Sequence, residues 1–328
     1  MGAGVMMPLM DPMPNMLLSR YAESMVWLAR YMERIENLAR LIEVTEVFVR
    51  LRSATNGWQC IIDINCDDEV FRSQYDRVTA ETIIRFYVLN RDNPNSIWCL
   101  ASAARENARA LRPLISTEMW TQLNVFTNFI LSLRADDIPL ARLSQLCTRI
   151  KQDCQTHTGV TEGTLYRDQA WLFYAIGKQI ERGDQTTRLI DIKYHALLPT
   201  AEGIGSETDL SQWTAVLRSA AGYHAFRRLM PTRMDPAGVA GFLLMNEAFP
   251  RSLATALRHI HHALGLLRTD HGLRRAAPII ERVEHLRALL SGQTMEEIII
   301  RGLHEFLDGM QGELATVQSL VADAFWRT

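Results

Sequence analysis

The chain has 328 residues, of which 48% are hydrophobic and 22% are charged, a composition typical of a globular protein that buries a large core. A formal net charge of −2 and a pI near 6.5 argue against general affinity for nucleic acid or for an anionic membrane. The five cysteines form no CxxC pair, which favours reduced thiols in a cytoplasmic protein over a metal site.

The pattern of apolar residues predicts helices along almost the whole chain. Residues 1–16 contain three prolines and no secretory signal, so we interpret them as a flexible N-terminal tail. From residue 17 onward apolar residues recur at intervals of three and four, and no run is long enough to span a membrane. The expected helices cover 19–54, 58–75, 79–91, 95–114, 116–134, 138–157, 165–198, 208–229, 236–246, 250–268, 278–290 and 294–325. The fold class is therefore all-α.

The second half of the chain repeats the first. The segment "WLARYMERIENLARLIE" at 27–43 returns at 175–191 with its charges in the same order. Two later blocks also recur in order, with the matched pairs Trp58 and Trp213, Phe71 and Phe226, Phe86 and Phe242, Asn90 and Asn246, Pro94 and Pro250, and Ser96 and Ser252. We therefore expect a duplicated helical bundle, with homologous halves at 17–163 and 164–328 around a pseudo-twofold axis in one globular unit.

Each copy of the repeated helix carries a charged stripe around one glutamate. The stripe contains Arg30, Glu33, Glu36, Arg40 and Glu43 in the first copy, and Lys178, Glu181, Asp184, Arg188 and Asp191 in the second, with Arg34 and Arg182 at its border. One interpretation is a solvated face whose ion pairs contribute only about 0.2–0.5 kcal/mol each. The other is that the two stripes meet or line one cleft. In that case Glu33 and Glu181 would be buried beside arginines, with Arg40, Arg188, Arg105 or Arg109 as the expected partners.

Two further patterns are candidates for binding. Arg105, Arg109 and Arg112 recur on one helix face and could clamp a phosphate or carboxylate, although pairing with the acids of the stripe is the favoured interpretation. His259 and His262 have a spacing that suits two metal ligands, but no carboxylate is in register with them, so no metal site is predicted.

The repeated segments resemble a known family. "LSRYAESMVWLARYMERIENLAR", "ARENARALRPLISTEMWTQLN", "IERGDQTTRLIDIKY" and "FPRSL" are similar to blocks of the alpha-E family, a bacterial helical domain whose Glu-Arg motif corresponds here to Glu33-Arg34 and Glu181-Arg182. Members tend to be encoded beside circularly permuted ATP-grasp proteins and transglutaminase-like peptidases. The resemblance implies a partner in a peptide- or amide-ligating system. No ATP-grasp segment is present, so ATP and Mg are implied only for a separate ligase chain, and no cofactor is expected on this one.

Three functions remain open at this point. The chain could be an accessory module that presents an acidic peptide or anionic intermediate to the ligase, an enzyme with Glu33 or Glu181 as general base, or a structural scaffold. Because Arg251 has no basic counterpart at Asn95, the halves have diverged and at most one is expected to hold an asymmetric site. The candidate polar cleft comprises Arg30, Glu33, Arg34, Glu36, Arg40, Arg105, Arg109, Arg112, Glu181, Arg182, Asp184, Arg188, Asp191 and Arg251.

A raised glutamate pKa in an open cleft would favour the enzyme. A Glu-Arg pair closed off by packing would favour the scaffold, and an apolar or arginine-rich groove open at one edge would favour the accessory module.

Overall fold

The computed structural model describes residues 17–52, 57–197, 207–231 and 234–327, and none of these residues is in a strand. The expected tail at 1–16 lies outside the described residues. The α-helices are α1 (Ser19–Arg52), α2 (Gln59–Asn65), α3 (Asp68–Arg72), α4 (Ala80–Ile84), α5 (Ile97–Ala110), α6 (Thr117–Ser132), α7 (Leu140–Thr164), α8 (Gln169–Leu197), α9 (Glu207–Ser219), α10 (Tyr223–Leu229), α11 (Pro236–Met245), α12 (Leu253–Thr269), α13 (Ala277–Ser291), α14 (Met295–Arg301) and α15 (Leu303–Phe325). Within the described residues, no helix is both long and apolar enough to cross a membrane.

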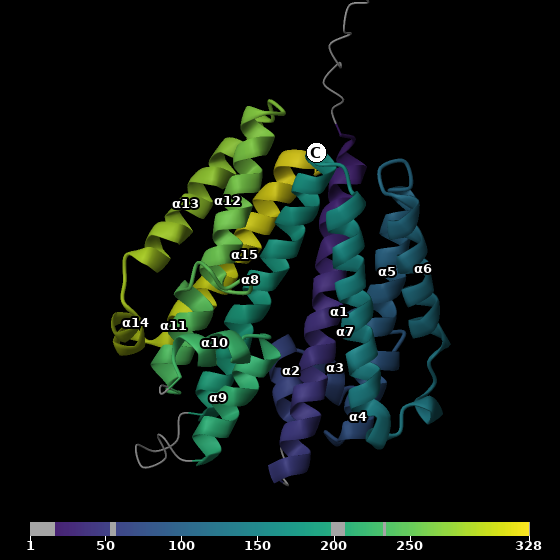
Figure 1. The fold of residues 1–328 in the computed structure, drawn as a ribbon, viewed down its shortest axis with the longest axis vertical. Coiled ribbons are helices and arrows are strands. Elements are labelled where there is room, and N and C mark those ends of the chain that lie inside the picture. Colours follow the sequence, from purple (N-terminus) through teal and green to yellow (C-terminus); the bar gives the residue numbers. More distant parts are fainter. Residues whose placement is uncertain (1–16, 53–56, 198–206, 232–233, 328) are drawn as a thin grey trace, which may run out of the picture.

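Helices α1 and α8 lie side by side in the middle of the molecule (Figure 1). They run parallel, since the backbone N–H of Leu17 donates to Gln169 Oε1 at 3.2 Å where both helices begin, and Arg30 on α1 reaches Glu181 further along. The helices come very close at Gly177, where a Cβ atom would lie 2.4 Å from the carbonyl oxygen of Val26. Glycine at this position therefore sets how closely the two helices approach.

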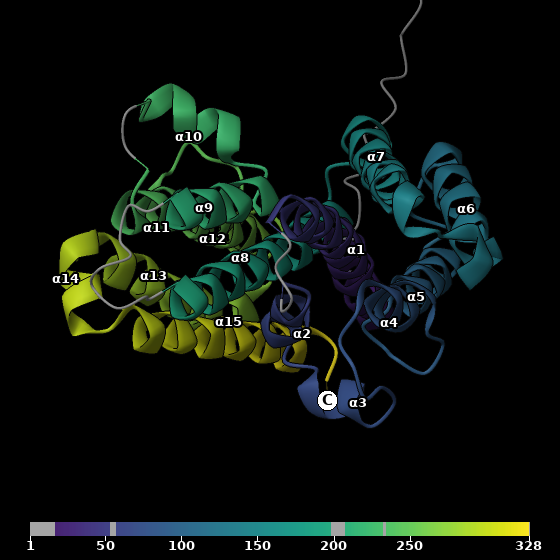
Figure 2. The ribbon, with the colours of Figure 1, turned by 90° about the horizontal axis from the view of Figure 1, so that it is seen from below.

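The remaining helices form a layer on each side of this central pair. Helices α5 and α7 pack on α1 and carry α6, while α12 and α15 pack on α8 and carry α13. Two short helices cross over: α2 packs against α8, and α9 packs against both α1 and α8, as the view from below shows (Figure 2). One apolar core runs through all of these contacts.

Three of the expected helices are each split in two. The helices expected at 58–75 and 208–229 break at Cys66 and Ala221, which both have φ of 56°, and the helix expected at 294–325 breaks at Gly302, with φ of 115°. A left-handed residue ends the hydrogen-bond ladder of an α-helix. Of the three, only Gly302 is a residue type that signals such a break, because it lacks a Cβ, so the two breaks at Cys66 and Ala221 were not predictable from residue type.

The turns before α5 and α12 are built from the same hydrogen bonds. Ser96 and Ser252 each accept at Oγ from the backbone N–H three residues later, and each donates to the carbonyl oxygen of an asparagine, Asn90 or Asn246. This N-cap fixes where each helix begins. It also fixes the residue directly before each cap, Asn95 or Arg251, at the side of the central helix pair.

Candidate functional site

The charged stripes of α1 and α8 meet between the two helices. Glu181 on α8 is fully buried, and its carboxylate accepts from Arg30 Nε at 2.8 Å and from Arg34 Nε and Nη2 at 2.6 and 3.0 Å. Both arginines belong to α1. The bidentate contact with Arg34 is the geometry in which a guanidinium binds a carboxylate most strongly.

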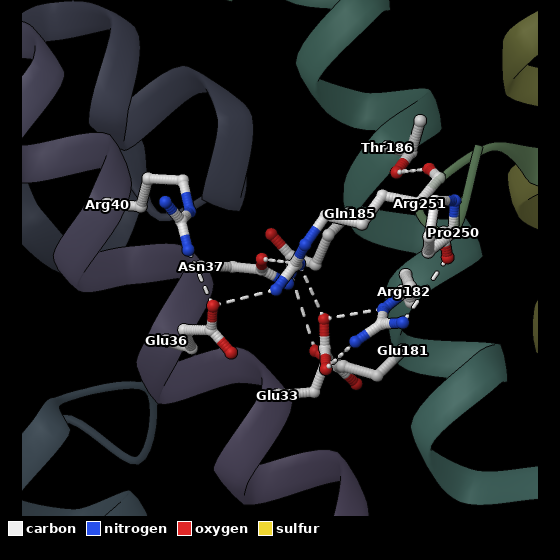
Figure 3. Close-up of polar contacts among 10 residues, drawn as sticks. All are labelled: Glu33, Glu36, Asn37, Arg40, Glu181, Arg182, Gln185, Thr186, Pro250 and Arg251. Carbon is white, nitrogen blue, oxygen red and sulfur yellow. Dashed lines mark hydrogen bonds and ion pairs between the residues drawn. The ribbon is translucent and has the colours of Figure 1, made fainter. Parts of the chain in front are cut away.

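Glu33 on α1 is bound by arginines that lie outside α1, one on α8 and one in the turn before α12 (Figure 3). Its side chain is 3% exposed and accepts from Arg182 Nε and Nη2 at 2.9 and 2.8 Å, and from Arg251 Nη1 at 2.7 Å. Arg251 also donates to Glu36 at 2.8 Å and to Asn37 at 2.8 Å. Each glutamate of the Glu-Arg motif is therefore bound by the arginine that follows the other glutamate. We call Glu33, Arg34, Glu181, Arg182 and Arg251 the Glu-Arg centre.

The prediction that the two glutamates are bound by Arg40, Arg188, Arg105 or Arg109 is wrong. Arg40 and Arg188 bind carboxylates on their own helices, Glu36 at 2.6 Å and Asp184 at 2.9 Å. These are i,i+4 pairs, which any helix can form, whereas the partners of Glu33 and Glu181 come from across the helix contact.

The row of arginines on α5 and the turn after it lies apart from the centre. Arg105 donates to Asn128 at 3.1 Å, Arg109 pairs with Glu106 at 2.9 Å, and the guanidinium of Arg112 lies over the ring of Trp120 at 4.9 Å. Within the described part of the chain none of the three pairs with an acid of the stripe, so that expectation is wrong, while the anion clamp stays a prediction. Arginines at this spacing are equally compatible with an exposed face of α5.

The outer ends of both stripes contact the last helix on their own side. Glu43 accepts from Thr148 and forms an ion pair with Lys151, both on α7, and Asp191 contacts His304 Nδ1 on α15 at 2.7 Å. These pairs attach α7 to α1 and α15 to α8.

The electrostatics of the centre keep both glutamates ionised. Burial alone would raise the pKa of the Glu33 carboxyl, but the Arg182 and Arg251 guanidiniums outweigh it and hold that pKa well below its usual range. For Glu181, burial is likewise outweighed by Arg34 and Arg30, and the pKa of its carboxyl is lowered. A carboxylate with a lowered pKa is a weak base, so this geometry suits charge pairing better than proton abstraction.

Residue-type reasoning missed Asn95 as a member of this network. Its Oδ1 accepts from Arg34 Nη1 at 3.2 Å, and its Nδ2 donates to Asp67 at 3.1 Å. The only signal in the sequence was its position directly before the capping Ser96, matched to Arg251 before Ser252.

Two cations of the charged stripes keep unused donors. Among the described residues, Arg40 Nε has no hydrogen-bond partner, and Lys178 forms neither a hydrogen bond nor an ion pair. Both residues line cavities.

The larger cavity is a groove of about 690 Å³ bounded by α1, α7, α9 and α10. Val44, Val47 and Phe48 form its apolar wall, and Arg40 and Arg218 contribute guanidiniums. We call it the arginine groove. An apolar wall with a few charged groups is the usual composition of a binding site.

Histidine, cysteine and acidic residues do not gather as metal ligands. Within the described part of the chain, no group of three or more such side chains could hold a metal ion. His259 and His262 both border a second, smaller cavity near Lys178.

The comparisons with known proteins identify a family but no activity. The chain is 25% identical over 265 residues to uncharacterized proteins from Mycobacterium bovis and from a strain of Mycobacterium tuberculosis, matches that cover 76% of this chain and 29% of each relative. The chain thus spans less than a third of the length of these relatives. No solved structure matches it. The Alpha-E family model, described as a predicted alpha-helical domain with a conserved ER motif, matches residues 17–326, so the chain belongs to the Alpha-E family.

Proposed function

We propose that the protein is a helical binding module that serves a separate, circularly permuted ATP-grasp ligase in a cytoplasmic peptide- or amide-bond-forming system. In this role it presents an acidic peptide end or an anionic intermediate, and a transglutaminase-like protein is a further possible partner. ATP and Mg belong to the ligase.

We also propose that residues 17–163 and 164–328 are copies of one helical unit related by a pseudo-twofold axis. The reciprocal Glu-Arg contacts support this. Further support comes from Cys66 and Ala221, which take the same left-handed conformation at matched positions, and from the matched caps of α5 and α12. The crossing of α2 onto α8 and of α9 onto α1 supports a single globular unit.

The arginine groove is the observation that carries the binding role. Arg40 and Arg218 both line it, and Arg218 lies on α9 with its guanidinium 5.1 Å from the centroid of the Tyr223 ring. A peptide end with an acidic group and an apolar side chain matches both the guanidiniums and the apolar wall. Binding in an open groove also leaves the acidic group accessible to a second protein.

An enzyme that uses Glu33 or Glu181 as general base is the weaker candidate. Both carboxylates are buried, bound by two arginines each, and lowered in pKa. The Glu-Arg centre is better suited to a structural role, which holds α1 and α8 in register and positions Arg40 and Arg218 across the groove.

The proposal is tested by measuring product formation by the neighbouring ATP-grasp protein with and without this chain. We expect negligible ATP hydrolysis by the isolated chain and a gain of product in the pair. Arg218→Glu should remove most of that gain with an unchanged melting temperature. Arg301→Glu, on the exposed side of α14, is the matched charge control and should have no effect.

Robust ATP turnover by the purified chain alone would overturn the proposal in favour of an enzyme. Equal product yields with wild type and Arg218→Glu would show that the arginine groove takes no part.

A further inference from the structure

A second cavity lies on the other side of the Glu-Arg centre, between α7, α8 and α12. It has a volume of about 340 Å³, which is enough for a small organic molecule. Its wall on α8 contains the buried Tyr174 and Gln179 and the half-buried Lys178, and its outer rim includes His259, His262 and Asp270. We call it the lysine cavity.

The Lys178 ammonium is the unusual group in this cavity. Arg30, at the matched position on α1, donates to Glu181 at 2.8 Å. Lys178 makes no such bond to Glu33, because Arg182 and Arg251 already occupy that carboxylate. Burial lowers the pKa of the Lys178 ammonium and the Arg182 charge adds to the lowering, while Glu33 and Glu162 act in the opposite direction. A bound anion would supply the direct ion pair that Lys178 does not form within the described part of the chain.

A second unsatisfied group adjoins the lysine. Gln179 is 8% exposed, and its Oε1 has no hydrogen-bond partner among the described residues. This oxygen is a hydrogen-bond acceptor that is closed off from solvent, so it does not contribute to the binding of an anion. The Lys178 ammonium is therefore the group of this wall that can bind one.

The charge balance of the walls restricts the ligand to one negative charge. Arg167 at the rim is neutralised by Glu162 at 3.0 Å, so Lys178 is the cation left to bind an anion. Asp270 at the rim opposes a second negative charge on the ligand. Trp171 and Leu266 supply apolar surface on either side of the opening. A carboxylate fits this balance better than a phosphate dianion.

We propose that the lysine cavity binds a small organic carboxylate, with its anionic group on the Lys178 ammonium and its apolar part against Trp171 and Leu266. The site is separate from the arginine groove, and it does not depend on the ligase role. Lys178 lies within electrostatic reach of Arg182 and Arg251, two residues of the Glu-Arg centre.

The test is calorimetric titration of the full chain with benzoate and with 3-phenylpropionate in a buffer free of carboxylates. The neutral amides of both acids serve as isosteres that lack the charge. We expect the carboxylates to bind at least about tenfold more tightly than the amides. Lys178→Met should weaken carboxylate binding by about tenfold or more, while Arg85→Met, which removes an exposed cation of α4 and its following turn, should leave it unchanged.

Thermal melting separates a ligand site from a structural lysine. Because Lys178 forms no hydrogen bond or ion pair within the described part of the chain, Lys178→Met should melt at the same temperature as wild type or higher. If this variant does not fold, Lys178→Gln provides the same loss of charge with a polar side chain. Arg218→Glu in the arginine groove should bind benzoate as wild type does, so failure of one proposal is distinguishable from failure of the other.

Three results would overturn the inference. They are equal binding of acids and amides, unchanged binding in the lysine variants, and a lowered melting temperature of Lys178→Met without carboxylate binding to the wild type.

Discussion

Glu181 and Glu33 have the same position in the repeated helix but different surroundings. Glu181 is bound by two arginines of one helix, Arg30 and Arg34. Glu33 is bound by Arg182 of α8 and by Arg251, which comes from the turn before α12. On the Glu181 side that turn carries Asn95, which accepts a hydrogen bond from Arg34 and brings no charge.

This difference accounts for Lys178, which forms no ion pair within the described part of the chain. Arg251 takes the place on Glu33 that a residue at position 178 could have filled, so Lys178 is left facing the lysine cavity. Likewise, Arg188 donates to Cys66 Sγ at 3.2 Å, whereas the matched Arg40 lies near Ala221, whose methyl group offers no acceptor. Two changes of residue type therefore leave Lys178 and Arg40 with unused donors, whereas the donors of their counterparts Arg30 and Arg188 are bound.

The largest expected effect comes from removing one of the two glutamates. Glu181→Ala should lower the free energy of unfolding by about 3–5 kcal/mol, because it leaves Arg30 and Arg34 partly buried without their carboxylate. Urea denaturation measures this loss. Glu81→Ala, which breaks an exposed pair with Arg85, is the control and should change little. A loss below about 1 kcal/mol for Glu181→Ala would show that the pairing contributes little to folding.

The comparison of the two glutamates is tested by replacing residues around Glu33 with their counterparts around Glu181. Arg251→Asn should cost about 2–3 kcal/mol, less than loss of a glutamate, because Glu33 keeps Arg182. Adding Lys178→Arg should recover part of that loss, since an arginine there can reach Glu33 as Arg30 reaches Glu181. A double-mutant cycle by urea denaturation measures the coupling. Purely additive effects would mean that positions 178 and 251 do not substitute for each other.

The close approach of α1 and α8 is tested at Gly177. Gly177→Ala should destabilise by about 1–3 kcal/mol, since its Cβ would lie 2.4 Å from a backbone oxygen that cannot move without the helix. Gly159→Ala on α7 is the matched control: nothing lies within 4 Å of its Cβ, and it should stabilise by about 0.5–1 kcal/mol. Thermal and urea unfolding of both variants give the comparison. Stabilisation by both substitutions would contradict the close contact.

The last prediction concerns how stability changes with pH and not a substitution at neutral pH. Because the pKa of both glutamates is lowered, neither is protonated in mild acid, but burial lowers the pKa of His157 on α7 to about 3. Between pH 6.5 and 3 the unfolded chain therefore binds a proton that the folded one excludes, and stability falls by about 1.4 kcal/mol per pH unit. Urea unfolding of His157→Met from pH 7 to 4 should show a shallower loss than wild type. Parallel pH profiles would disprove a role for His157.

Periodicity was sufficient for the helical fold class, and the resemblance of four sequence blocks was sufficient for the family. The interval of three and four apolar residues predicted an all-helical fold, and the element ends were close wherever a serine caps a helix, as at Ser96 and Ser252. The predictions failed where Cys66 and Ala221 end helices in a left-handed conformation. These residues have no intrinsic preference for that conformation, and it is imposed by packing of the short helices around them.

The sequence by itself also determined which residue types form the charged stripes, because position along an α-helix fixes the face. It did not determine which arginine binds which glutamate. That choice depends on the register of α1 against α8, which the Gly177 contact sets, and on Arg251, which is distant in sequence and placed by the cap of α12. The tertiary structure also decided that Lys178 and Arg40 face cavities, since an unused donor exists only where three-dimensional packing has given its carboxylate to another cation.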